Sequence, residues 1–83
     1  MKIHYAVSAA EQLRELPVVI QERILRKIFW FSEQKDPLIF AKLLSGTQVY
    51  RFRIGTYRIL FEIAGETLWI LKILPRDKAY RGL

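Results

Sequence analysis

The sequence predicts one small α+β domain, in which an antiparallel sheet is packed on one face by a helix hairpin in the order β-α-α-β-β-β. Three observations carry this prediction. Apolar residues alternate near the N-terminus, recur every three or four residues between Ile20 and Phe31, and alternate again from Val49 onward. The chain of 83 residues has room for a single hydrophobic core, so residues 1–83 form one domain.

The N-terminal segment is expected to form a strand and then a short helix. The strand covers residues 2–7, whose odd-numbered side chains are apolar. Ser8 stands three residues before Glu11, which is the spacing of a capping box at the start of a helix. The inner side of this helix would carry Ala9, Ala10, Leu13 and Leu16.

A second helix is expected to begin at Pro17, because proline lacks the N–H that a first helical residue would leave unpaired. Its inner stripe would consist of Ile20, Ile24, Ile28 and Phe31. The helix should end at Asp36–Pro37, and residues 38–44 would add one more helical turn. The run at residues 28–31 is more apolar than one buried stripe requires, so it indicates either a wide core stripe or a surface that meets a partner or a second copy.

Three strands are expected over residues 48–54, 57–64 and 67–74. Gly55-Thr56 and Gly65-Glu66 are two-residue turns with glycine first, as a type II′ hairpin prefers. Opposed residues in a hairpin share a face, so the apolar face would carry Tyr50, Phe52, Ile54, Tyr57, Ile59, Phe61 and Ile63. The other face, which we call the arginine face, would carry Arg51, Arg53, Arg58, Leu60 and Glu62.

The arginine face contains a local conflict, because the first turn sets Arg53 directly opposite Arg58. Like charges opposed across two strands destabilise them by up to about 1 kcal/mol. Such conflicts are expected at functional sites, so the face is a candidate phosphate cradle. The alternative is that these arginines are solvated or pair with Glu62 and other acids. Glu62 on this face could also serve only to orient an arginine.

The composition excludes several classes of site. The chain has no cysteine and one histidine, His4, which excludes disulfides, thiolate metal sites and a histidine cluster. A lone histidine is more often structural or exposed than catalytic. No cofactor and no metal are expected. The lack of cysteine favours the cytoplasm, and the absence of a long apolar run predicts that the protein has no membrane partner. The net charge of +6 favours a polyanion or an acidic protein as partner.

The last strand is expected to end before Pro75, because proline cannot continue a ladder of hydrogen bonds. The C-terminal tail follows this strand directly. It adds two arginines and a tyrosine to the end of the sheet, at Arg76, Arg81 and Tyr80. Tyrosine can stack on a base or exchange a proton, and arginine matches a phosphate with two parallel hydrogen bonds. A tyrosine that anchors the C-terminus in the core is the alternative for Tyr80.

These features resemble the RelE/ParE superfamily of toxins from toxin–antitoxin systems. The resemblance rests on the element order, on LLSGTQVYRFRIGTYRILFEI and on the ending ILKILPRDKAYR, and it covers essentially the whole chain. It implies a cytoplasmic toxin held inactive by a cognate antitoxin, with higher-order toxin–antitoxin complexes among its assemblies. The RelE branch cleaves mRNA in the ribosomal A site, and the ParE branch inhibits DNA gyrase.

The resemblance also implies the site residues of the RelE branch. The catalytic set would be Arg51, Arg53, Arg58, Arg76 and Tyr80, and the RNA-binding set Arg51, Arg53, Lys78 and Arg81. This complete set favours a metal-independent endoribonuclease that stops translation. A gyrase inhibitor and a degenerate module that only binds its antitoxin are the alternatives. Family members often have lysine at the first two positions, and arginine here stabilises charge but is a poor base, so the proton acceptor is unassigned.

Overall fold

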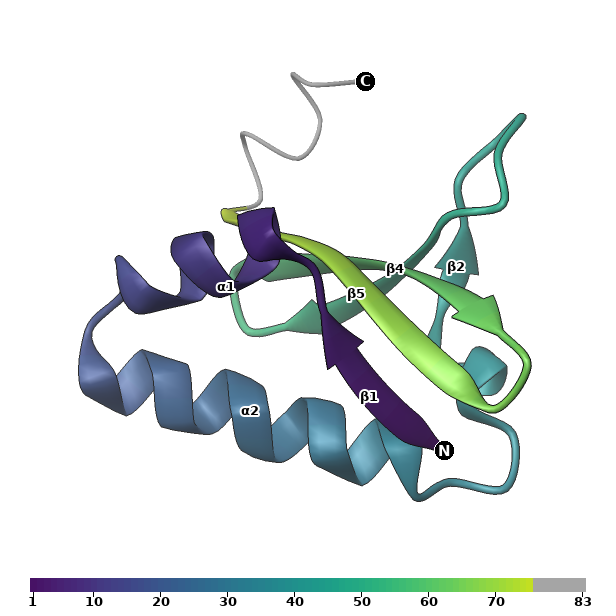
Figure 1. The fold of residues 1–83 in the computed structure, drawn as a ribbon, viewed down its shortest axis with the longest axis horizontal. Coiled ribbons are helices and arrows are strands. Elements are labelled where there is room, and N and C mark those ends of the chain that lie inside the picture. The colour runs from purple at the N-terminus through teal and green to yellow at the C-terminus, as the bar shows by residue number, and fades with distance from the viewer. Residues whose placement is uncertain (76–83) are drawn as a thin grey trace.

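The computed structural model describes residues 1–75, which form a five-stranded sheet covered by two helices (Figure 1). The elements are β1 (Lys2–Tyr5), α1 (Val7–Arg14), α2 (Val18–Ser32), a 3-10 helix (Pro37–Phe40), β2 (Lys42–Leu43), β3 (Tyr50–Ile54), β4 (Tyr57–Ala64) and β5 (Thr67–Pro75). The strand order is β1-β5-β4-β3-β2. The α+β fold with helices packed on the sheet is confirmed. Within residues 1–75, no helix is both long and apolar enough to cross a membrane.

The sheet differs from the prediction at its two edges. β1 pairs with β5 in parallel, whereas the other pairings are antiparallel. No tight turn joins β1 to β5, so turn geometry does not dictate its direction. At the other edge, the helical turn expected over residues 38–44 ends at Phe40, and β2 pairs with β3 through Lys42 and Leu43.

The N-terminal boundaries also differ from the prediction. β1 ends at Tyr5, and Val7 is the first residue of α1 and is exposed. The predicted capping box is wrong, because the Ser8 hydroxyl donates to the Leu71 carbonyl at 2.7 Å instead of capping α1. Pro17 is the N-cap of α2 and not its first residue. Its missing N–H is tolerated at this end of the helix, as predicted.

The core lies between α2 and the apolar face of the sheet. Phe52 stacks between Phe31 and Phe61, with ring centroids 3.8 Å and 4.1 Å away. This stack joins α2 to β3 and β4. The apolar run at residues 28–31 divides between core and surface: Ile28 and Phe31 are buried, whereas Phe29 and Trp30 are exposed.

A β-bulge interrupts the pairing of β4 with β5. Leu60 is opposite Lys72, but the next residue, Phe61, is opposite Ile70, so Leu71 is the extra residue. A bulge reverses the alternation of side chains along the strand that carries it. As a result, Ile70 and Ile73 are both buried, and Lys72 turns to the face of the sheet that Leu60 occupies.

Candidate functional site

The β3–β4 hairpin has the predicted register. The turn at Gly55-Thr56 has a positive φ of 60° at Gly55 and none at Thr56, which fits a type II′ turn. Arg53 is opposite Arg58, and Arg51 is opposite Leu60. Because opposed residues share a face, the three arginines lie together on the arginine face, on the side of the sheet opposite the buried Phe52.

The three arginines differ in burial. Arg53 is exposed and Arg51 is half-buried, whereas Arg58 is 2% exposed and is the largest fully buried side chain among residues 1–75. Removing a guanidinium from water is costly, and surrounding groups must offset that cost. The hypothesis of a simply solvated arginine therefore does not hold for Arg58. An anion that approaches from solvent would meet the exposed Arg53 directly, and Arg58 would add positive charge from within the structure.

Two lysines extend the arginine face, and the sequence-based prediction missed both. Lys42 of β2 is opposite Arg51, and Lys72 of β5 is opposite Leu60, so the four residues form a row across four strands. Lys42 was hidden in a segment expected to be helical. Without the bulge, regular alternation would turn Lys72 toward the core, where a lysine is unfavourable. The lysine in this position of the sequence therefore indicates that the strand is irregular.

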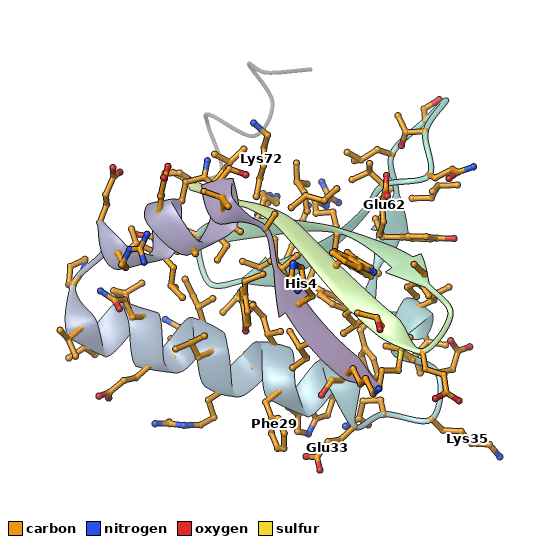
Figure 2. The ribbon with its side chains drawn as sticks, viewed as in Figure 1. His4, Phe29, Glu33, Lys35, Glu62 and Lys72 are labelled. Carbon is orange, nitrogen blue, oxygen red and sulfur yellow. The ribbon has the colours of Figure 1, made fainter. Side chains whose placement is uncertain are left out.

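Farther along the same face, Glu62 is opposite Trp69, and Trp69 is opposite His4. The rings of His4 and Trp69 have centroids 4.2 Å apart. Figure 2 shows Glu62 and Lys72 on the side of the sheet away from α2. Four residues of strand separate Glu62 from Arg58, which corresponds to about 13 Å. His4 lies two strands farther across, so Glu62 is the nearer of these two titratable side chains to Arg58.

The remaining predicted site residues, Arg76, Lys78, Tyr80 and Arg81, lie outside the described residues. Among residues 1–75, no group of three or more His, Asp or Glu side chains is arranged to hold a metal ion. What the described part of the site offers is positive charge on a rigid surface, from Arg51, Arg53, Arg58, Lys42 and Lys72. Such a surface can bind a phosphodiester and stabilise additional negative charge on it.

Comparison with known proteins relates most of the chain to one group. A family model described as the ParE toxin of a type II toxin–antitoxin system matches residues 3–80. Toxin RelE3 of Methanocaldococcus jannaschii is 29% identical over 84 residues, which cover 96% of this chain and 96% of the relative.

Solved structures are similar over the same length. A chain of the toxin–antitoxin complex RelBE2 from Mycobacterium tuberculosis superposes with a TM-score of 0.79 and 28% identity, covering 90% of this chain and 96% of that chain. A chain of the RelB–RelE antitoxin–toxin complex from Methanococcus jannaschii superposes with a TM-score of 0.74 and 26% identity, covering 95% of this chain and 96% of that chain. The similarity therefore includes the helices and the sheet together.

Proposed function

The chain belongs to the ParE/RelE family of toxins of type II toxin–antitoxin systems, and we propose that it is a RelE-like, metal-independent endoribonuclease that cleaves mRNA in the ribosomal A site. The observation that carries this proposal is the register that brings Arg51, Arg53 and Arg58 onto one face of the sheet. Its partners would be the ribosome, its message and a cognate antitoxin. Similar structures of RelE bound to RelB support the antitoxin.

The reaction is attack by the ribose 2′-oxygen on the adjacent phosphorus. A bond forms between the 2′-oxygen and phosphorus, and the bond from phosphorus to the 5′-oxygen breaks. The 2′-hydroxyl loses a proton and the leaving 5′-oxygen gains one, so the products are a 2′,3′-cyclic phosphate and a 5′-hydroxyl. The RNA supplies the nucleophile, so the protein has to orient the phosphodiester and stabilise the charge that develops on it, for which each preorganised donor contributes about 3–4 kcal/mol.

The arginines divide this task by their burial. Arg58 is held almost out of solvent, so its guanidinium is preorganised and acts on the developing charge together with Arg76. The more accessible Arg51 and Arg53 bind the RNA backbone on either side. Tyr80 stacks on a base or relays a proton.

Two further cations in the tail, Lys78 and Arg81, add contacts to phosphates. Contacts of this kind strengthen binding without reading the base sequence. Their removal should therefore weaken binding of the message while leaving the preferred cleavage position unchanged.

The reaction also needs a group that accepts the 2′-hydroxyl proton. Arginine stays protonated, whereas lysine can act as a base in its neutral form. Lys42 and Lys72 share the row of Arg51 and Leu60 on the arginine face, so they are the candidates for this role in the described residues. Replacement of the lysine that accepts the proton by methionine should lower the cleavage rate without weakening binding of the message.

The test is cleavage of a defined message on purified ribosomes, with the cut positions mapped by primer extension. Arg58→Gln should lower the rate by about 10²–10³-fold, the usual loss for one stabilising donor. Lys35→Gln is the matched control, since Lys35 is exposed in the loop after α2 and points away from the sheet (Figure 2). Circular dichroism checks that each variant is folded.

Two outcomes would contradict the proposal. Cleavage that survives both Arg58→Gln and Arg53→Gln would show that the arginine face is not the active site. An intact message, combined with inhibition of supercoiling by purified gyrase, would place the chain with the gyrase-directed members of the family instead.

A further inference from the structure

A second cationic surface lies beside the arginine face, between α2 and the outer edge of β3. Two adjoining pockets of about 470 Å³ and 370 Å³ share Lys27, Trp30 and Arg53 among their lining residues. We call them together the α2–β3 groove. Each volume falls within the roughly 300–1,000 Å³ of small-ligand sites. The groove is open because β2 pairs only with Tyr50 and Arg51, which leaves residues 52–54 at the edge of the described sheet.

The charge of the groove has one sign. Among the described residues that line it, none is acidic, and six are cations: Arg23, Arg26, Lys27, Lys42, Arg51 and Arg53. The first three come from one side of α2, because positions three and four apart are neighbours on a helix. Like charges at these spacings oppose helix formation. Glu22, four residues before Arg26, can offset part of this repulsion, and a polyanion bound in the groove would offset more of it.

Aromatic side chains lie inside this cationic rim. Trp30 and Phe40 both line the larger pocket and are 40% and 41% exposed, respectively. Their ring centroids are 5.0 Å apart, and the Lys27 ammonium lies 4.6 Å from the centre of the Trp30 ring. Aromatic surface beside cations is how proteins bind single-stranded nucleic acid, because bases stack on rings while phosphates meet the charges.

The groove and the arginine face meet at β3. Arg51 and Arg53 line the groove, and both also lie on the arginine face. A strand of RNA held by the arginine face can therefore continue around the edge of β3 without leaving positive charge. An acidic peptide would meet the same charges, but its carboxylate side chains do not stack on aromatic rings as bases do.

We propose that the α2–β3 groove binds a nucleotide of single-stranded RNA next to the phosphodiester on the arginine face. The base stacks on Trp30 and meets Phe40 with its edge, because the two rings are inclined at 66° to each other, and Arg26 and Lys27 bind the adjoining phosphate. This inference rests on the proposed function in one respect, since it takes the RNA substrate as the ligand. It adds α2 to the substrate-binding surface.

The test measures binding of a fluorescein-labelled 2′-O-methyl hexanucleotide, which cannot undergo attack by a 2′-hydroxyl, by fluorescence anisotropy. Trp30→Ala should weaken binding by about five- to 150-fold, the range for loss of one stacked base. Phe29→Ala is the matched control, because Phe29 is 56% exposed on the neighbouring position of the same helix and does not line the groove. Its affinity should equal that of the wild type.

Variants that remove a charge test the groove even if the Trp30→Ala variant does not fold. Lys27→Gln and Arg26→Gln should each reduce the slope of log affinity against log salt by about 0.7, the value for one contact to a single-strand phosphate. Lys35→Gln should leave the slope unchanged.

The results separate this inference from the proposed function. Binding that depends on Trp30 and Lys27, in a protein that does not cut ribosome-bound message, would support the groove and overturn the ribonuclease. Binding that is lost in Arg53→Gln but unchanged in Lys27→Gln and Trp30→Ala would overturn the groove and leave the ribonuclease standing. A loss confined to Trp69→Ala would place the RNA across the far end of the arginine face and would likewise overturn the groove. The groove inference would also be overturned if the free protein bound no oligonucleotide and the antitoxin covered the groove in the complex.

Discussion

The two hairpin turns make a matched pair of sites at which backbone strain can be measured. Gly55 and Gly65 each occupy the first position of a two-residue turn, with φ of 60° and 59°. A Cβ at Gly55 would lie 3.2 Å from an Nη atom of Arg23, whereas a Cβ at Gly65 would meet nothing within 4 Å. Gly55→Ala therefore combines strain with displacement of Arg23, and Gly65→Ala introduces strain alone.

The expected magnitudes follow from these contacts. Alanine in a left-handed conformation costs about 1–2 kcal/mol, and this part should be equal at the two turns. The atoms near Gly55 are the far end of the flexible Arg23 side chain, so the guanidinium can shift by a few tenths of an ångström. The loss of stability in Gly55→Ala should therefore be larger than that in Gly65→Ala by only about 0.5 kcal/mol. A chain of 83 residues has a total stability of about 4–12 kcal/mol, so both variants should remain folded.

The assay is urea denaturation followed by circular dichroism, with thermal unfolding as a check. Gly65→Ala should lower Tm by about 4–16 °C and Gly55→Ala by about 6–20 °C, at 4–8 °C per kcal/mol. In an Arg23→Ala background, the difference between the two turns should disappear. A Gly65→Ala variant as stable as the wild type would refute the strain argument. A difference above about 2 kcal/mol between the turns would instead show that Arg23 cannot move, because displacing a mobile side chain costs less.

Three further predictions concern the hairpin, the core and the N-terminal strand. Arg53→Gln removes the like charge opposite Arg58, so the free energy of unfolding should rise by up to about 1 kcal/mol, while the rate of cleavage falls. A lower free energy of unfolding in urea would contradict this prediction. Phe52→Ala removes the central ring of the stack and should cost about 3–5 kcal/mol in the same assay, and a cost below about 1 kcal/mol would mean that the stack does not hold α2 to the sheet. Burial raises the pKa of Tyr5 above its ordinary 10.0, so the unfolded chain releases this proton first and stability falls as pH rises above 10.0. Tyr5→Phe should lack this part of the decline in urea titrations between pH 9 and pH 11, about the range over which tyrosine titrates, and identical declines in both proteins would refute it.

The register of the β3–β4 hairpin could be predicted because its determinants are local. Gly55 allows the positive φ that a two-residue turn requires, and the turn then pairs every residue on either side of it. Alternation assigned Phe52 to the core and Arg53 to the opposite face without knowledge of any other element. The same local reasoning identified the apolar stripe of α2.

Other parts of the surface depend on contacts between distant segments. Lys42 joins the arginine face only because β2 pairs with β3, and a strand of two residues has no detectable period of its own. Lys72 joins it because of the bulge at Leu71. Ser8 has the spacing of a cap, but its hydroxyl instead bonds to the carbonyl of that same Leu71.

By itself, the sequence determined the fold class, the core stripe and the placing of Arg51, Arg53 and Arg58 on one face, because period and turn chemistry act over a few residues. Only the tertiary structure decided that Arg58 is buried, that Lys42 and Lys72 extend its face, and that Arg26, Lys27 and Trp30 of α2 line a groove against β3. Burial and neighbourhood across strands and helices depend on which distant segments pack together, and no local period encodes that.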